Sequence, residues 1–244
     1  MDRWSQIPIV YLSAESNPGL RGQALLRGGD AFLEKPINTT LLINLCKARV
    51  ARLRKLEHTK NRDALTGLLK HASIKEALQD QWQLARRKPQ AFCVVMLDID
   101  HFKRINDTYG HVVGDSVIAA MGTLLRQRFR STDKLGRYGG EEFALVLLDC
   151  TSDNALSMVN SLREDFAAIR FTAGDASFSC TLSAGVADNQ HFLDAAAESL
   201  LEKADKALYQ AKQSGRNRVC LAVNEAASHL VAGVDDEDTG SSKK

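Results

Sequence analysis

Two adjacent carboxylates follow two glycines in the sequence Gly139-Gly140-Glu141-Glu142-Phe143. Because glycine has no Cβ, it permits tight turns and lets a backbone approach a ligand closely. The apolar run of residues 144–148 comes directly afterwards and is typical of a buried strand. The pattern therefore predicts a hairpin turn that presents two acids to a ligand at the head of a strand.

A second acidic pair, in Asp98-Ile99-Asp100, ends the apolar run of residues 92–97. Carboxylates at the carboxyl end of such a strand commonly face a ligand-binding crevice. If the hairpin of residues 137–148 pairs beside this strand, Asp98 and Glu141 come within reach of one cation. Their hard oxygen ligands would suit Mg²⁺ or Mn²⁺. An Asp-x-Asp at a strand end is by itself often a simple turn, so the hypothesis depends on both motifs together.

Basic residues elsewhere could hold the charge of a phosphate. Lys212 lies just before Gly215-Arg216, at an expected helix end, where the helix dipole alone would also favour a cation. The sequence Arg130-Ser131-Thr132-Asp133 offers a guanidinium that can fork onto a phosphate, beside a carboxylate that can accept N–H groups. The simpler alternative for Arg130 is the solvated, arginine-rich end of a helix.

Alternating elements must position these groups. Gly215 is expected to stop the last helix, and Asp115, after Gly114, could be a simple helix cap. Strands mixed with helices predict an α/β fold, an α+β sandwich with helices on the faces of a mixed sheet. We expect helices over residues 73–87, 115–128, 154–169 and 193–213, strands over 92–98, 178–186 and 218–223, and a polar, disordered tail over 224–244.

The first sixty residues have a different pattern. Short strands are expected over residues 7–12 and 31–33, with a weak helix over 18–27 between them. A helix without Gly or Pro follows over 39–61, after the capping residue Asn38. Its apolar stripe is partial, so the helix is either a solvated connection or a parallel dimer stalk. The main domain is expected over 62–223.

Composition and charge exclude several classes of protein. A net charge of +2 over 244 residues provides no broad field for a nucleic acid polymer or a membrane surface. No run approaches the ~20 apolar residues of a membrane helix. The five cysteines form no Cys-x-x-Cys pair, so buried free thiols in a reducing compartment are the simplest interpretation. The N-terminus lacks a signal-peptide pattern, which favours a cytoplasmic protein unless an upstream part is missing.

The motifs together resemble those of GGDEF domains of bacterial diguanylate cyclases, in their GGEEF variant. The resemblance extends over most of the chain, roughly from residue 62 to 223. It implies a mixed central sheet flanked by helices, like that of nucleotide cyclases. The sequence of residues 63–68 matches the start of such domains, but Lys70-His71 stands where Asn-Arg is usual. The replacement puts the hydrogen bonds of this junction in question.

The resemblance implies that two GTP are condensed into cyclic di-GMP and two pyrophosphates. Asp98, the carbonyl of Ile99 and Glu141 would hold Mg²⁺ or Mn²⁺, with two ions per site, and Glu142 would complete the second metal site. Glu141 is implied to be the base that takes the 3′-hydroxyl proton, although the division of roles between the two catalytic acids stays open. The residues implied to bind GTP are His101, Phe102, Lys103, Asn106, Asp115, Gly139, Gly140, Lys212 and Arg216, of which Asn106 and Asp115 match the positions that read guanine.

Each 3′-hydroxyl must attack the other nucleotide, so the resemblance also implies a catalytic homodimer. Arg130 and Asp133 would form a site at which cyclic di-GMP inhibits, with Arg163 as a candidate second arginine. The alternative is a non-catalytic receptor or scaffold that binds GTP or cyclic di-GMP. Degenerate family members usually lose an acid or a glycine of the GGEEF motif, and this chain keeps them all.

Residues 1–38 resemble the back portion of a response-regulator receiver domain. Ser13 would end its fourth strand, and Lys35-Pro36 would follow its fifth. The acidic pocket and the phosphorylated Asp of a receiver belong to earlier strands, so phosphorylation of this chain in the usual manner is not expected. Two strands are too few for an independent sheet, and the segment is either part of something longer or packs on another element.

Overall fold

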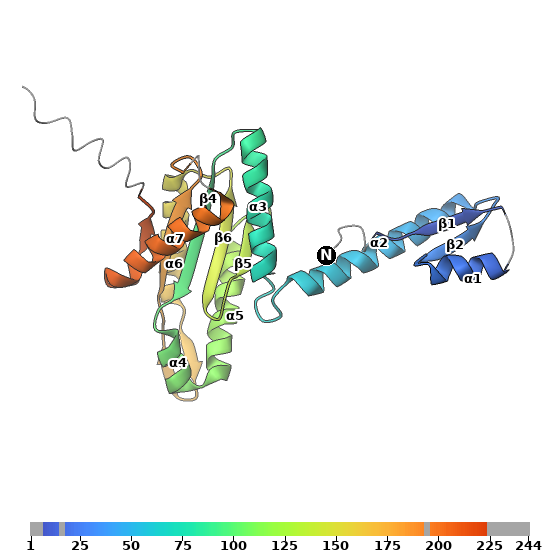
Figure 1. Ribbon diagram of the computed structural model, residues 1–244. Coiled ribbons are helices and arrows are strands. Elements are labelled where there is room, and N and C mark those ends of the chain that lie inside the picture. Colours follow the sequence, from blue (N-terminus) through green and yellow to red (C-terminus); the bar gives the residue numbers. More distant parts are fainter. Residues whose placement is uncertain (1–6, 15–17, 193–195, 224–244) are drawn as a thin grey trace, which may run out of the picture. The chain divides into compact units, whose positions relative to one another are not determined.

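The computed structural model describes residues 7–14, 18–192 and 196–223, and leaves out the side chains of residues 53–60. Contacts divide the chain into two units, Met1–Asn61 and Arg62–Lys244 (Figure 1). The predicted tail over 224–244 lies outside the described residues. Within the described part, no helix combines the length and the apolar character needed to cross a bilayer.

The first unit contains two short strands and two helices. Strand β1 (Val10–Ser13) pairs in parallel with β2 (Ala31–Glu34). Helix α1 (Pro18–Leu26) connects them, and helix α2 (Thr39–Asn61) follows. The side chain of Asn38 accepts a hydrogen bond from the backbone N–H of Leu41, 3.0 Å away, so it caps α2 as the sequence predicts.

The second unit is built on a six-stranded sheet with the order β10-β9-β4-β6-β5-β3. Every residue of the neighbouring strands β4 (Phe92–Ile99) and β9 (Leu182–Asp188) is buried. Strand β4 runs antiparallel to both β9 and β6 (Glu142–Leu148). The outer strands are β5 (Lys134–Arg137), β3 (Leu69–Lys70) and β10 (Val219–Leu221).

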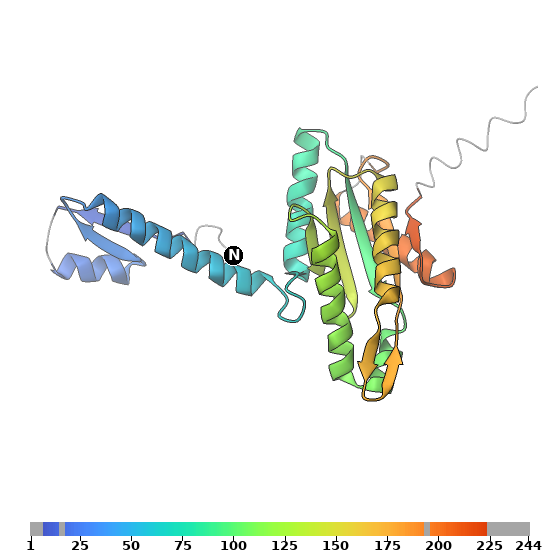
Figure 2. The same cartoon turned by 180° about the vertical axis from the view of Figure 1, so that it is seen from behind.

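Helices cover both faces of this sheet. Helices α3 (His71–Arg87) and α7 (Ala197–Gln213) lie on the face seen in Figure 1. Helices α5 (His111–Arg128) and α6 (Ser152–Ala168) cover the opposite face, seen in Figure 2. Alternate residues of β4 enter two separate cores, Cys93 and Val95 on one side and Val94 and Met96 on the other, as the two-residue period of a strand requires. This architecture confirms the predicted mixed sheet flanked by helices.

Gly185 in β9 shows how closely the layers pack. A Cβ built at this position would lie 2.0 Å from the carbonyl oxygen of Ala204 in α7, so only glycine allows the helix to approach.

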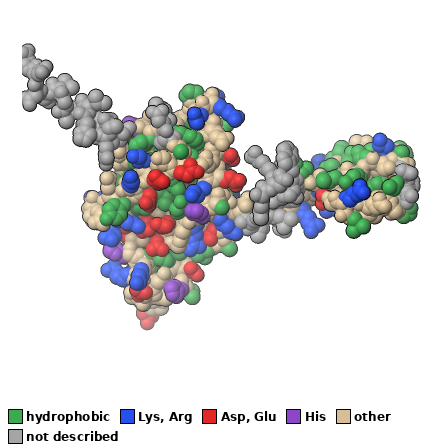
Figure 3. Space-filling view, in the orientation of Figure 1, with side chains coloured by type: hydrophobic (Ala, Val, Ile, Leu, Met, Phe, Trp, Pro, Cys, Tyr) green, Lys and Arg blue, Asp and Glu red, His purple; other side chains and the backbone are tan. Residues whose placement is uncertain are grey.

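Figure 3 shows acidic and basic side chains interspersed over this face of the second unit, in agreement with the small net charge of +2.

Several predicted boundaries were wrong. Helix α5 begins at His111 rather than at residue 115, so Asp115 lies inside the helix and does not cap it. An additional helix, α4 (Phe102–Tyr109), precedes it. The expected strand over 178–186 consists of the end of β8 (Ala176–Phe178) and of β9, while β8 forms a separate hairpin with β7 (Phe171–Ala173).

Candidate active site

The two acidic motifs lie side by side at one end of the sheet. Asp98, near the end of β4, is opposite Glu142, the first residue of β6. The backbone N–H of Ile99 donates to the carbonyl of Glu141, 3.4 Å away, and the N–H of Tyr138 closes the glycine turn on the carbonyl of Glu142, 2.8 Å away. The expected pairing of the hairpin beside β4 is therefore confirmed.

Asp98 lies in an environment with more negative than positive charge. Its side chain is 9% exposed, and one carboxylate oxygen is 2.8 Å from the Nζ of Lys212. Burial, together with the carboxylates of Glu141 and Glu142, raises the pKa of Asp98 to about 6, although Lys212 acts in the opposite direction. One lysine therefore does not compensate the burial of Asp98 beside two other acids.

This electrostatic arrangement fits a divalent cation. Among the described residues, no three or more His, Cys, Asp or Glu side chains are placed so that they could hold a metal ion as they stand. The carboxylate of Asp98 instead contacts Lys212, while its pKa is raised mainly by burial and in addition by repulsion from Glu141 and Glu142. Carboxylate oxygens are hard ligands, and a cation between them would remove the repulsion that the protein alone leaves uncompensated.

Asp100 has a structural task that the sequence analysis did not assign. Its buried carboxylate accepts hydrogen bonds from the hydroxyls of Thr181 and Ser183, both 2.7 Å away, and from the backbone N–H of Asn217, 3.1 Å away. Asn217 and Arg216 both have positive φ, 47° and 61°, a conformation that non-glycine residues adopt only when their surroundings impose it. Asp100 thus ties the loop that carries Arg216 to the end of β4.

The predicted GTP-binding residues after β4 fall on different parts of helix α4. His101 is exposed and has a φ of 57° immediately before the helix, and Lys103 is exposed in its first turn. The side chain of Phe102 is 7% exposed and belongs to the core, so only its backbone is left for a ligand. An aromatic ring at the start of an amphipathic helix packs inward, so any contact of Phe102 with a triphosphate would come from its backbone.

Asn106 and Asp115 lie on consecutive helices, and Asp115 is exposed. The side-chain oxygen of Asn106 is buried and has no hydrogen-bond partner among the described residues. A Cβ on Gly114 would lie 1.9 Å from that oxygen, so glycine makes room for the amide. A buried polar atom without a partner is costly, which favours a ligand at this position.

Arg137 connects the glycine turn to the start of the domain. Its guanidinium donates from Nε and Nη2 to the carbonyl of Gly140 (3.0 and 2.8 Å) and from Nη1 to Asp63 (3.2 Å). Asp63 also accepts from the backbone N–H and the hydroxyl of Thr66, at 2.8 and 2.7 Å. The His71 ring, where the family usually has Arg, packs 4.3 Å from that of Tyr138. The replacement of Asn-Arg by Lys70-His71 thus leaves a contact between the junction and the turn.

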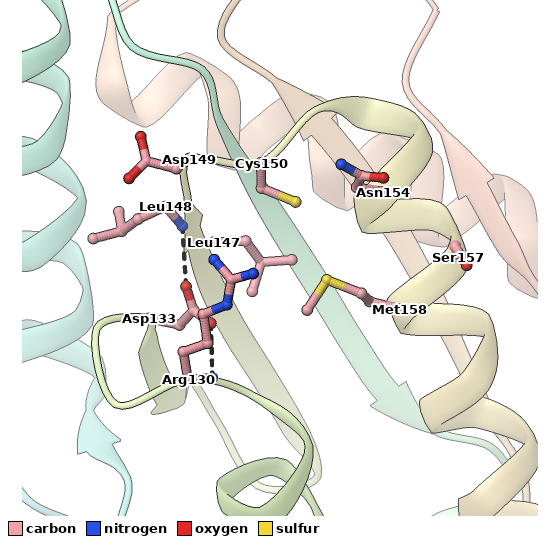
Figure 4. A pocket seen from close by; sticks show the side chains of 9 residues that line it. All are labelled: Arg130, Asp133, Leu147, Leu148, Asp149, Cys150, Asn154, Ser157 and Met158. Carbon is pink, nitrogen blue, oxygen red and sulfur yellow. Dashed lines mark hydrogen bonds between the residues drawn. The ribbon is translucent and has the colours of Figure 1, made fainter.

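A separate cavity of about 300 Å³ contains the other predicted site. Arg130 and Asp133 both line it (Figure 4). The two carboxylate oxygens of Asp133 accept the backbone N–H groups of Arg130 (3.0 Å) and Leu148 (3.1 Å). Arg163 does not line this cavity. Its guanidinium donates to the side chains of Asn217 (2.9 Å), Asn160 (3.3 Å) and Glu164 (2.8 Å).

Comparisons with known proteins agree with this geometry. The family described as "Diguanylate cyclase, GGDEF domain" matches residues 60–218. The diguanylate cyclase DgcP of Pseudomonas aeruginosa is 38% identical over 160 residues, which cover 66% of this chain and 24% of DgcP. The response regulator PleD of Caulobacter vibrioides is 31% identical over 230 residues, 89% of this chain and 50% of PleD. The chain thus spans half or less of the length of these relatives.

Solved structures show the same fold. One is the GGDEF domain of DgcB from Caulobacter crescentus in complex with c-di-GMP, which matches with a TM-score of 0.64 at 30% identity. The match covers 66% of this chain and 95% of the DgcB chain. The active GGEEF domain of a diguanylate cyclase from Vibrio cholerae has a TM-score of 0.61 at 31% identity, covering 65% and 99%. With a family match over more than half of its length, this chain belongs to the GGDEF domain family of diguanylate cyclases.

Proposed function

We propose that the protein is a diguanylate cyclase that condenses two GTP into cyclic di-GMP and two pyrophosphates. The observation that carries the proposal is the end of β4, where Asp98 lies opposite Glu142 and 2.8 Å from Lys212. The carboxylates of Asp98, Glu141 and Glu142 therefore lie near the amino group of Lys212 at one end of the sheet. Such a group suits phosphoryl transfer and has no evident structural purpose. The complete GGEEF motif favours an enzyme over a receptor or scaffold that only binds nucleotide.

Asp98, the carbonyl of Ile99, Glu141 and Glu142 would hold the divalent ions, Mg²⁺ or Mn²⁺, that GGDEF cyclases require. When bound, such ions neutralise charge on the reacting phosphate and on the attacking and leaving oxygens. Glu141 accepts the proton of the 3′-hydroxyl. Its exposure is intermediate, so its carboxylate can reach a substrate above the sheet.

Basic residues at the end of α7 and at the start of α4 hold the triphosphate. Lys212 contacts Asp98 and lies in the last turn of α7, and exposed Arg216 follows in a backbone conformation fixed through Asp100. His101 and Lys103 border the substrate from the start of α4, and Gly139 and Gly140 let the turn approach it closely. Cations at both ends of the phosphate chain favour release of pyrophosphate.

Asn106 and Asp115 select guanine over adenine. A carboxylate accepts both the N1–H and the exocyclic amine of guanine, whereas adenine presents an acceptor at N1. The partnerless oxygen of Asn106 would gain a hydrogen bond only when a base is present. The site therefore favours GTP over ATP.

One domain binds one GTP, so two domains must face each other for turnover. We infer that α2 serves as a dimer stalk and that residues 1–38 derive from a receiver. The PleD match supports this inference, because it covers 89% of the chain, more than the second unit alone contains. The pocket at Arg130 and Asp133 would bind cyclic di-GMP and restrain the enzyme.

The direct test is incubation of the pure protein with GTP and Mg²⁺, followed by separation of the nucleotides. We expect cyclic di-GMP from the unchanged chain and from a Glu76→Ala control, which removes an exposed acid of α3. Glu141→Ala and Glu142→Ala should each abolish the product. Binding of cyclic di-GMP without any turnover would instead support the receptor, and substitution of Arg130 should relieve product inhibition.

A further inference from the structure

Two cysteines that the proposed reaction does not use lie together beside the Arg130–Asp133 pocket. The thiol of Cys93, in β4, donates to the backbone carbonyl of Cys150, 3.3 Å away, and the two side chains are near enough to shift each other's pKa. Both residues are buried, with exposures of 0% and 5%. The turn at Asp149, with a φ of 48°, folds the chain after β6 back onto the start of β4.

The two thiols are not equivalent. Cys150 lines the pocket together with Arg130 (Figure 4), whereas Cys93 does not line it and is fully buried. The hydrogen bond from Cys93 lowers the pKa of the Cys150 thiol, and Arg130 lowers it further, against the effects of burial and Asp133. The same hydrogen bond and burial raise the pKa of Cys93. Cys150 is therefore the thiol that meets a solute first and ionises more readily.

We propose that Cys93 and Cys150 form an oxidisable dithiol whose disulfide weakens ligand binding at the Arg130–Asp133 pocket, an inference that rests on the proposed product site. The oxidant is a hydroperoxide such as hydrogen peroxide. The Cys150 thiolate attacks it, an S–O bond forms, the O–O bond breaks, and water leaves after protonation. Cys93 then attacks the sulfenic sulfur, the S–S bond forms, and the hydroxyl leaves as a second water with the proton of Cys93.

The link from the thiols to the pocket runs through two residues of backbone. Leu148, two positions before Cys150, donates its N–H to one oxygen of Asp133, whose other oxygen accepts the N–H of Arg130. A disulfide draws the Cys150 sulfur from the pocket wall towards Cys93. The strand end must follow, and the hydrogen bond between Leu148 and Asp133 is then strained or lost. Loss of one such bond corresponds to about a tenfold weaker affinity.

The experiment uses the full chain with Cys46→Ser, which removes an exposed thiol that could crosslink two molecules. The protein is treated with hydrogen peroxide, digested without reduction and mapped by mass spectrometry. We expect a peptide that joins Cys93 to Cys150, absent in a Cys150→Ser variant. Cys180→Ser is the matched control, because Cys180 is also buried and burial raises its pKa to about 12. That variant should form the disulfide like the parent.

Two further readouts test the effect of the disulfide. Cyclic di-GMP affinity, measured by calorimetry, should fall about tenfold on oxidation and return on addition of a reductant. Hydrogen exchange of the Leu148 amide, which needs no ligand, should accelerate. The absence of a linked peptide would overturn the dithiol, and a linked peptide with unchanged Leu148 exchange would overturn its coupling to the pocket. Failure of the reduced protein to bind cyclic di-GMP would refute the product site and not the dithiol.

Discussion

Replacement of Asp98 by Asn should stabilise the metal-free protein while abolishing its activity. Burial raises the pKa of this carboxyl from 3.8 to about 6. At neutral pH the folded protein therefore holds an ionised carboxyl whose ionisation is less favourable than in the unfolded chain. The shift of about two units corresponds to about 3 kcal/mol of unfolding free energy. The amide of Asn carries no charge and avoids this cost.

The sign of the pH dependence follows from the raised pKa. At low pH the carboxyl is protonated in both states, and Asp98 costs nothing. As the pH rises from 3.8 to about 6, the unfolded chain loses its proton first, so the stability contributed by this group falls. Above about pH 6 the carboxyl is ionised in both states, and the loss of unfolding free energy has reached its full value. The gain from Asp98→Asn should therefore be close to zero at pH 4 and close to its full value at pH 7.5.

The measurement is denaturant unfolding in the presence of a chelator, at both pH values. The fluorescence of Trp82 reports the second unit, since its ring packs edge-on against Phe92 with centroids 6.2 Å apart. A Trp4→Phe background removes the other tryptophan. Asp107→Asn is the matched control, because that carboxylate is exposed on α4, and it should give the same small change at both pH values.

Addition of Mg²⁺ extends the same test. A cation bound at the carboxylates should stabilise the parent protein and leave the Asp98→Asn variant unchanged, so the difference between them should shrink. The reasoning is refuted if the variant is less stable than its parent at pH 7.5. It is equally refuted if the change is the same at both pH values, because the carboxylate would then not be the source of the cost.

Three other substitutions test the remaining parts of the site. Lys212→Met removes the group that lowers the pKa of Asp98, so the acidic limb of the kcat/KM profile should move to higher pH; an unmoved limb would contradict the pairing. Gly114→Ala places a Cβ 1.9 Å from the Asn106 oxygen and should lower kcat/KM for GTP about tenfold, with cyclic di-GMP binding unchanged. Asp100→Asn replaces one acceptor oxygen by an N–H group, so the hydroxyls or the Asn217 N–H that Asp100 now binds lose a partner. The loop that carries Arg216 is then held less firmly, and the KM for GTP should rise about tenfold while kcat changes less. A loss confined to kcat would show that Asp100 does not act through the phosphate loop.

The sequence was informative where one local pattern determines one element. Continuous apolar runs marked β4 and β6, and their terminal acids followed directly from the strand ends. Since an antiparallel pair aligns strand ends, the meeting of Asp98 with the two acids of the hairpin could be anticipated, although the sequence analysis named Glu141 and the residue opposite Asp98 is Glu142. Short elements gave no such signal, because strands of two or three residues such as β3 and β7 are too brief for a hydrophobic period to appear.

Gly114 shows why local rules failed near the nucleotide-binding helices. Read alone, a glycine before Asp115 suggests a helix boundary, yet both residues lie inside α5. The reason for the glycine is a contact eight residues back along the chain, where the Asn106 amide occupies the space of a Cβ. Arg163 was misjudged in the same way, because its position on α6 places it against Asn217 rather than in the Arg130 pocket.

Arg137 marks the limit of motif-based reasoning most clearly. No pattern associates it with Asp63, 74 positions away, and only the parallel pairing of β3 with β5 brings the start of the domain beside the glycine turn. Once they meet, one rigid guanidinium binds Asp63 and the carbonyl of Gly140 together. A planar fork cannot follow two partners that move apart. Any movement of the segment at Asp63 must therefore either carry the turn before Glu141 with it or break one of these bonds.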